Sequence, residues 1–463
     1  MRSERVVGPT MRFFGNIRTW DFSLFFKDTF IMSWLERQFK LTANSTTVRT
    51  ELAAGLTTFM AMAYIIVVNP GILSKAGMPF GPVLVATCLG AALGCFLMGL
   101  FANYPFALAP GMGLNAFFTY TVVLSMGVSW QVALAAVFVE GVVFLVLTLT
   151  RIREKVVNTI PRNIKIGISA GIGLFITFIG LQNAGIVVAN PATSVGLGNL
   201  KAAPALLAMF GVLLMVFLHI RRVNGSILIG IAAVTLLGIP FGVTKLPESF
   251  VSMPPSLAPV FCQLDFTQVL TGGFWAVVIA FFFVDFFDTV GTLVGCASRS
   301  GMLNERGELP RARPALFSDA VATVAGACLG TSTVTTFVES ATGIEQGGRT
   351  GLTAVACGVL FLAAVFFYPI LAIVPACATA PALIMVGIFM MLGLQKLDYK
   401  DWTELFPSFL AVFMMPLGYS IAVGIEFAVV SYVVIKAISG RFREVSWVMT
   451  ILAVAFVLNR FFM

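Results

Sequence analysis

Five acidic residues lie well inside apolar stretches of the sequence: Glu140, Asp285, Asp288, Glu339 and Glu426. An acid at the centre of a membrane helix costs at least about 2.5 kcal/mol, so each one requires a reason. A carboxyl group in such a place can accept hydrogen bonds from a polar solute, and it can bind and release a proton. Each of these residues is therefore a candidate either for binding a solute or a proton, or for a structural contact with Ser, Thr or backbone groups.

Two of the acids belong to the run FVDFFDTVGTLVG, residues 283–295, where Asp285 and Asp288 lie three apart on one helical face. An intramembrane aspartyl hydrolase is one reading of this pair. Such enzymes need two carboxyl groups from facing elements that share one proton, which two acids on one helical turn provide poorly. We therefore expect no enzyme here, and the hydrolase is the unlikely alternative.

Two stretches of the chain are unlike ordinary membrane helices. Residues 104–120, YPFALAPGMGLNAFFTY, carry prolines and glycines, and residues 330–351 begin with a threonine-rich segment. Non-helical backbone at membrane depth persists only where it lines a cavity, so both stretches indicate a binding site. Asn115 follows the first break and Glu339 follows the second. We expect Glu339 and Asp288 to bind a polar planar solute and a proton, with Asn115 supplying an amide.

The residues around these breaks complete the predicted site. We predict that a substrate contacts Glu339, Asp288, Asn115, Val338, Phe337 and Thr336, with supporting contacts from Asp285, Thr292 and Ser340. Asp288 and Glu339 are the predicted proton-binding groups. The one histidine, His219, is adjacent to Arg221 and Arg222 at the end of an apolar run, which indicates a position at the membrane interface.

The composition places these residues in lipid. Of 463 residues, 59% are hydrophobic and 11% are charged, so most of the chain cannot face water. The net charge of +8 comes from lysines and arginines in short connections between apolar runs, which set membrane orientation and argue against nucleic acid as a partner. Seven scattered cysteines without C-x-x-C spacing predict neither a disulfide framework nor a metal site.

Apolar runs of bilayer-spanning length recur along the chain. They lie near 53–70, 83–101, 105–125, 131–150, 164–184, 202–220 and 225–243, and then near 274–296, 315–329, 331–345, 351–375, 378–395, 404–420 and 422–438. These runs predict an all-α polytopic membrane protein with fourteen transmembrane segments. A further apolar run, 445–461, is either a fifteenth span or a peripheral helix.

The basic residues test this count. They follow even-numbered spans, at Arg151, Arg153, Lys155, Arg162, Lys165, Arg221, Arg222, Arg299, Arg306, Arg311, Arg313, Lys436, Arg441 and Arg443. All then lie on one side of the membrane, which the positive-inside rule assigns to the cytoplasm. We predict a cytoplasmic N-terminal segment over residues 1–45 and a membrane transporter domain over 46–463.

Seven spans in each half are consistent with an inverted repeat, because an odd number of spans makes the second half enter the membrane from the opposite face. The third run of each half is the broken one, which supports this 7+7 correspondence. A transporter's binding site is expected where two such breaks meet.

Four motifs resemble one known family. AGLTTFMAMAYIIVVNP (54–70), GMGLNAFF (111–118), FDTVGTLVG (287–295) and FVESATGIEQGGRTGLTAV (337–355) are similar to the azaguanine-like branch of the nucleobase-cation symporters, the bacterial hypoxanthine, guanine and adenine permeases. The resemblance extends from about residue 40 to the end of the chain.

The resemblance implies a fold and a site. It implies core spans over about 53–150 and 274–375, gate spans over about 164–243 and 378–438, and short β-strands in spans three and ten. In the more distantly related uracil permeases an E-x-x-G motif resembles Asp288-Thr289-Val290-Gly291, and a second substrate-binding glutamate resembles Glu339. Their histidine after the first acid is replaced by Thr292 here, and the resemblance assigns no role to Asp285.

The function implied is import of purine nucleobases by proton symport across a bacterial inner membrane, with no cofactor besides the coupling proton. An ionised Glu339 would accept the N1–H of hypoxanthine or guanine, whereas a protonated one would donate to N1 of adenine. Guanine and hypoxanthine are favoured, and adenine stays open. Alternatives are transport of xanthine or uracil, sodium coupling, and an anion carrier of the same architecture. The expected partners are the purine, the lipid bilayer and, as one option, a second copy of the chain in a homodimer.

Overall fold

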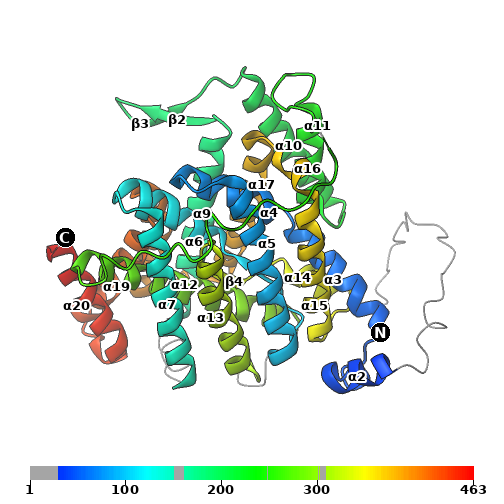
Figure 1. Cartoon of the computed structure of the whole chain (residues 1–463). Coiled ribbons are helices and arrows are strands. Elements are labelled where there is room, and N and C mark those ends of the chain that lie inside the picture. Colours follow the sequence, from blue (N-terminus) through cyan, green and yellow to red (C-terminus); the bar gives the residue numbers. More distant parts are fainter. Residues whose placement is uncertain (1–29, 151–160, 248, 301, 303–308, 463) are drawn as a thin grey trace, which may run out of the picture.

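The computed structural model describes residues 30–150, 161–247, 249–300, 302 and 309–462. Helices dominate the described chain (Figure 1). The elements of the first half are α2 (Phe30–Phe39), α3 (Val48–Met62), α4 (Ile65–Leu73), η1 (Ser74–Ala76), α5 (Phe80–Leu97), η2 (Met98–Ala102), β1 (Leu108–Pro110), α6 (Met112–Ala116), η3 (Phe117–Ser125), α7 (Trp130–Leu149), α9 (Arg162–Asn183), β2 (Val187–Asn190), β3 (Ser194–Leu197), α10 (Ala203–Ile220) and α11 (Ser226–Leu237).

The second half begins after a long connection. Its elements are α12 (Gly272–Ser300), α13 (Ala312–Leu329), β4 (Val334–Thr336), α14 (Ser340–Glu345), α15 (Gly351–Ala364), η4 (Val365–Phe367), α16 (Tyr368–Ala372), α17 (Ala376–Met391), η5 (Leu392–Lys396), α18 (Trp402–Leu417), α19 (Ile421–Ile438), η6 (Phe442–Glu444) and α20 (Trp447–Phe462). The run 445–461 is thus a helix, α20, which packs against α19. Most of the predicted N-terminal segment, residues 1–29, lies outside the described residues.

Each predicted apolar run contains helix, so the prediction of an all-α polytopic membrane protein is confirmed. Within the described residues, eight helical stretches are long and apolar enough to cross a membrane, and five shorter apolar helices accompany them. The count of fourteen spans in two inverted repeats stays a prediction.

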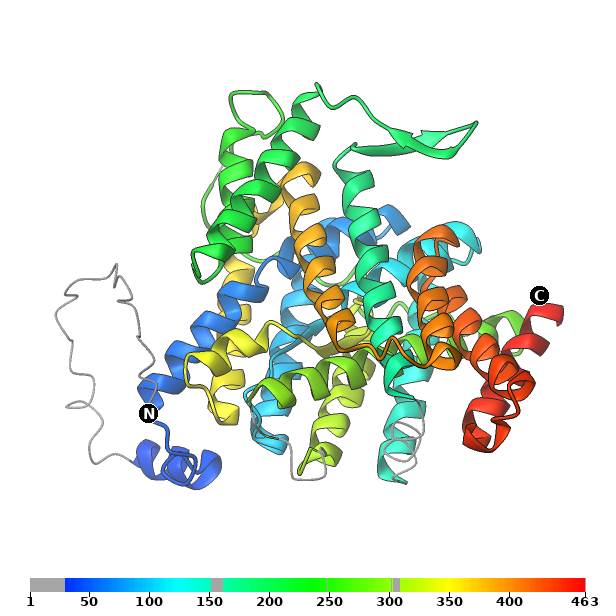
Figure 2. The ribbon, with the colours of Figure 1, turned by 180° about the vertical axis from the view of Figure 1, so that it is seen from behind.

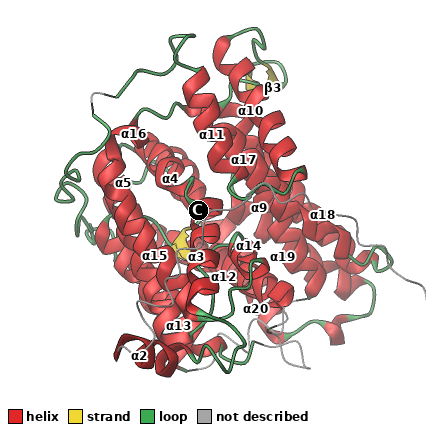
Figure 3. Ribbon diagram, turned by 90° about the vertical axis from the view of Figure 1, so that its right-hand side faces the viewer, coloured by secondary structure: helices red, strands yellow, loops and turns green. Residues whose placement is uncertain are grey.

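The helices pack in two groups. In one group α15 packs against α3 and α5, and α7 packs against α12 and α13. In the other, α9 packs between α17 and α18, and α10 packs against α11 and α17 (Figure 2). The view in Figure 3 separates α5, α13 and α15 from α9, α10, α17 and α18.

Two short sheets accompany the helices. The first pairs β1 with β4 in the interior, and the second pairs β2 with β3 in an antiparallel hairpin beyond the end of α9. Figure 1 shows this hairpin projecting from the helices. No strand was predicted between the apolar runs 164–184 and 202–220, so this hairpin was not anticipated.

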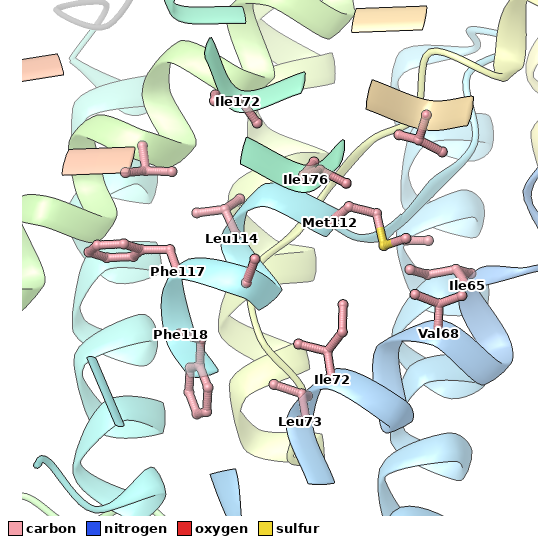
Figure 4. Close-up of a cluster of buried hydrophobic side chains, with 14 of the residues drawn as sticks. Ile65, Val68, Ile72, Leu73, Met112, Leu114, Phe117, Phe118, Ile172 and Ile176 are labelled. Carbon is pink, nitrogen blue, oxygen red and sulfur yellow. The ribbon is translucent and has the colours of Figure 1, made fainter. Parts of the chain in front are cut away.

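A buried apolar cluster joins the two helix groups (Figure 4). Met112 and Leu114 of α6, Ile65 of α4 and Ile176 of α9 all belong to this cluster. The close approach of α9 depends on Gly113, because a Cβ atom there would lie 2.8 Å from Cγ2 of Ile172. The glycine after the first break therefore permits contact between the two groups beside the strand pair.

Candidate functional site

Strands β1 and β4 meet in antiparallel register, with Leu108 opposite Thr336 and Pro110 opposite Val334. All residues of both strands are buried. Pro110 and the glycines beside it disfavour helix, and the β-branched residues of β4 favour an extended backbone. The prediction that spans three and ten are broken and contain short strands is confirmed, and the two breaks form one structure.

Backbone hydrogen bonds extend this pair at both ends. The N–H of Phe337 donates to the carbonyl of Ala107 at 3.0 Å, and the N–H of Gly111 donates to the carbonyl of Thr333 at 3.0 Å. Ser340 reinforces one end, since its hydroxyl oxygen accepts from the N–H of Ala107 at 2.9 Å. The supporting position predicted for Ser340 is therefore behind the strands.

Asn115 lies at the other end of the strand pair and is fully buried. The hydroxyl of Ser332 donates to its side-chain oxygen, and its amide nitrogen donates to the carbonyl of Pro110 at 3.4 Å. Its side chain thus links the two broken spans. Asn115 is not among the residues that line the cavity described below, and its contact with a substrate stays a prediction.

Glu339 follows β4 directly and precedes α14. Its Oε1 accepts a hydrogen bond from the hydroxyl of Tyr64 at 2.6 Å. Tyr64 lies at the junction of α3 and α4 and is 1% exposed. The second break thus places a carboxyl group against the first predicted span, 275 residues away along the chain.

Asp288 approaches the same place from α12. A Cβ atom added to Gly111, at the end of β1, would lie 3.5 Å from Oδ2 of Asp288. Thr292, one turn later, donates its hydroxyl to the backbone carbonyl of Asp288 at 2.9 Å. Thr292 therefore satisfies the helix backbone and does not engage the Asp288 carboxyl group in this structure.

A cavity of about 200 Å³ brings these acids together. Its lining includes six of the residues predicted from sequence, namely Asp288, Thr292, Thr336, Phe337, Val338 and Glu339. The cavity lies between the two helix groups. Its other lining residues are Tyr64, Gly111, Met112, Gly113, His219, Thr335, Ala341, Thr342, Glu345, Val386, Phe389, Met390 and Leu392.

Asp285 lies behind this cavity, fully buried. The Thr289 hydroxyl is 3.0 Å from Oδ1 of Asp285, 3.2 Å from Oδ2 of Asp319 and 3.1 Å from the hydroxyl of Thr335. One hydroxyl carries one proton, so it can donate to only one of these oxygens at a time. This network connects a second pair of acids, neither of which lines the cavity, to Thr335 of β4.

Sequence reasoning missed three residues of this region. Asp319 lies in the run 315–329 and carried the same signal as the other buried acids. Tyr64 gave no signal, because a tyrosine in an apolar run is usually a packing residue. His219 was placed at the interface; it is exposed and also lines the cavity, with its ring centroid 5.0 Å from that of Phe389.

Over the part of the chain that the structure describes, no group of three or more His, Cys, Asp and Glu side chains could hold a metal ion. The cavity offers a different chemistry. Three carboxyl groups and the hydroxyls of Thr335 and Thr336 provide hydrogen-bond partners for a polar solute, while Phe337 and Phe389 provide apolar ring surface. Such a site can bind a small planar molecule and exchange a proton.

A multi-pass helical membrane protein whose cavity lies at two paired, broken spans has the construction of a secondary transporter. Solved structures share the fold. The transmembrane domain of the cyanobacterial bicarbonate transporter BicA aligns with a TM-score of 0.62 at 17% identity, covering 82% of this chain and 97% of that one. SLC26A9 aligns with a TM-score of 0.59 at 11% identity, covering 92% of this chain and 73% of that one.

The chain belongs to the permease family, whose model matches residues 49–427. A Methanocaldococcus jannaschii protein named only as a permease is 51% identical over 93% of this chain and 98% of that protein. The guanine/hypoxanthine permease PbuG of Bacillus subtilis is 45% identical, covering 90% and 97%. The adenine permease AdeP of Escherichia coli is 44% identical, covering 92% and 95%. The resemblance to the azaguanine-like permeases is confirmed, and the chain is a transporter and not an enzyme.

Proposed function

We propose that this protein imports purine nucleobases by proton symport, with guanine and hypoxanthine favoured over adenine. The observation that carries the proposal is the cavity in which Asp288 of α12 and Glu339 after β4 meet beside the paired strands. Relatives of similar identity are named for guanine/hypoxanthine and for adenine, which supports a purine substrate. The preference among purines is therefore argued from the residues of the cavity.

The charge of the cavity supports a base over an anion. Among the described residues that line it, the ionisable ones are Asp288, Glu339, Glu345, His219 and Tyr64, and none is lysine or arginine. An anion site needs basic groups or unpaired N–H donors directed at the ligand. The carboxyl groups of Asp288, Glu339 and Glu345 instead suit a neutral solute with N–H donors, accompanied by a proton.

We propose that the two helix groups act as the predicted core and gate domains. Tyr64, Asp288 and Glu339 reach the cavity from the first group, and His219, Val386, Phe389 and Met390 reach it from the second. Movement of one group against the other would change the side from which the cavity is reached. We place the basic ends of the helices and the N-terminus in the cytoplasm of a bacterial inner membrane; a homodimer stays a prediction, checked by cross-linking in membranes.

Uptake of radiolabelled hypoxanthine and guanine by cells expressing the protein tests the proposal. We expect accumulation that a protonophore abolishes and that unlabelled purines inhibit. Inhibition by uracil alone would contradict the purine assignment. Stronger inhibition by xanthine than by hypoxanthine or guanine would keep a purine as the substrate and make xanthine the preferred one. Uptake that resists the protonophore and requires sodium would contradict proton coupling.

A further inference from the structure

Tyr64 stands out in the cavity because of what its hydroxyl does. The side chain is 1% exposed, and a buried tyrosine hydroxyl needs a hydrogen-bond partner. That partner is Oε1 of Glu339, at 2.6 Å. Both residues line the cavity, so the bond lies at the place where a solute would meet the carboxyl group.

The bond constrains what Glu339 offers to a ligand. A carboxylate accepts hydrogen bonds through two oxygens, and the Tyr64 hydroxyl engages one of them. Donation from a hydroxyl also stabilises the charged form of a carboxyl group. With Tyr64 donating, Glu339 presents its other oxygen as an acceptor.

Purines differ in what they present to an acceptor. A 6-oxopurine carries an N1–H, which a carboxylate can accept, whereas the N1 of a 6-aminopurine is itself an acceptor. Two acceptors facing each other leave a polar group unsatisfied, which disfavours that pairing. The state of Glu339 therefore decides between these two classes.

We propose that Tyr64 is the residue that sets this choice: by donating to Oε1 of Glu339, it holds the carboxyl group as an acceptor and selects 6-oxopurines. This inference rests on the proposed purine transport and adds the reason for the preference. The junction between α3 and α4 contributes to the site through this side chain.

The Tyr64→Phe variant removes the hydroxyl and keeps the ring that fills the space. Without that donor the neutral form of Glu339 is favoured, and a neutral carboxyl group can donate to N1 of a 6-aminopurine. We expect the ratio of the inhibition constants of adenine and hypoxanthine to fall by about tenfold, the equivalent of one hydrogen bond of ordinary strength. A general packing defect would lower transport of both purines and leave this ratio unchanged.

Tyr432→Phe is the matched control, because Tyr432 is 2% exposed in α19 and does not line the cavity. It should leave the ratio at the wild-type value. If Tyr64→Phe abolishes uptake, binding of hypoxanthine and adenine to the purified variant is compared by thermal shift. A variant that binds neither would assign Tyr64 a structural role and overturn the inference.

The outcomes separate this inference from the proposed function. A wild-type protein that transports hypoxanthine, together with a Tyr64→Phe variant of unchanged ratio, would overturn the role of Tyr64 alone. A wild-type protein that prefers adenine would also overturn it and leave purine transport standing. Absence of purine transport by the wild-type protein would instead contradict the proposed function.

Discussion

The ammonium group of Lys75 lies 3.1 Å from the hydroxyl of Tyr120 and also donates to the side-chain oxygen of Asn183. Lys75 lies in η1, shortly after the first predicted span, and Asn183 ends α9, at the opposite end of that helix from Arg162. Tyr419 adds a neighbouring contact, since its hydroxyl donates to Gln182 at 2.7 Å. The bond between Lys75 and Asn183 joins the two helix groups at the end of α9 opposite Arg162.

The Lys75→Met substitution should weaken this contact between the two helix groups. Its hydrogen bonds hold together elements that must separate if the cavity is to open on this side. Met112→Cys places a thiol in the cavity lining. We expect this thiol to react a few-fold faster with a membrane-impermeant maleimide, added outside cells, when Met112→Cys is combined with Lys75→Met than when it is present alone. The exposed Cys262 is replaced by serine to remove background labelling. Lys201→Met, at an exposed lysine before α10, is the control, and equal rates in the two variants would contradict the prediction.

The two acids of the cavity are expected to be necessary for transport. Asp288→Asn and Glu339→Gln keep the size of the side chain and remove the ability to carry a proton as a carboxyl group. We predict that uptake falls by about a hundredfold or more in each, a loss of roughly 3 kcal/mol, while the protein still reaches the membrane. Glu426→Gln, in α19 outside the cavity lining, should transport normally. Wild-type uptake by either site variant would remove that residue from the site.

The Thr289 hydroxyl should matter for stability as well as for transport. It lies within hydrogen-bond distance of two buried carboxyl groups and of Thr335 on β4. Thr289→Val removes a donor beside these acids, which we expect to cost about 1 to 3 kcal/mol and to lower the Tm in detergent. Thr289→Ser keeps the hydroxyl and should recover most of the loss. Equal Tm values for the valine and serine variants would show that the hydroxyl contributes nothing.

Much of the fold could be predicted because it depends on local composition. Apolar runs require helices in lipid, and the prolines, glycines and threonines of residues 104–120 and 330–351 are poor helix formers. The two breaks were therefore evident. A site where the two breaks meet followed from their matching positions in the two halves, and the short strands followed from the resemblance. The direct pairing of these strands, with Leu108 opposite Thr336, required the structure.

The contacts that complete the site are not local. Tyr64 and Glu339 are 275 residues apart, and nothing in the residues around Tyr64 distinguishes it from the other aromatic residues of the chain. Asp319 meets Thr289 because α12 and α13 both pack against β4, which no periodicity encodes. Asn115 was chosen for its amide, yet its partner Ser332 depends on how the two breaks lie together. Residue types were readable from the sequence; partners were not.

Glu51 is predicted to be the main polar anchor of α15. It is fully buried in α3, and its carboxylate accepts from the N–H groups of Arg349, Thr350 and Thr353 and from the Thr353 hydroxyl at 2.6 Å. These donors precede and begin α15, where unpaired N–H groups favour a negative partner. Glu51→Ala should lower the free energy of unfolding by about 3 kcal/mol or more, because several buried donors lose their acceptor. Glu51→Gln should cost less, and a Tm unchanged in Glu51→Ala would contradict this role.

Acid should weaken a charged network near the C-terminal end of the chain. Nη2 of Arg441 lies 3.0 Å from Oδ2 of Asp401, and Nε of Arg441 lies 2.7 Å from Oε1 of Glu444. Nζ of Lys436 lies 2.6 Å from Oε2 of Glu444 and 4.0 Å from Oε1 of Glu404. Hydrogen bonds from Thr403 and Arg441 lower the pKa of Asp401 to about 2, and those from Arg441 and Lys436 lower the pKa of Glu444 to about 2. A lowered carboxyl pKa contributes stability that is complete above the unfolded value of about 4 and is lost as the pH falls toward 2.

Measuring the Tm of the wild-type protein and of Arg441→Gln from pH 7 down to pH 3 tests this predicted loss of stability in acid. We expect the difference between the two proteins to be constant from pH 7 to about pH 5, because both carboxyl groups are ionised in the folded and unfolded states there. Below about pH 4 the difference should shrink, since the acids that Arg441 stabilises begin to take up protons on unfolding. Arg443→Gln, at a neighbouring arginine with no ion pair among the described residues, should show no such trend. If the Tm difference between the two proteins grows as the pH falls, Arg441 does not stabilise the fold through Asp401 and Glu444.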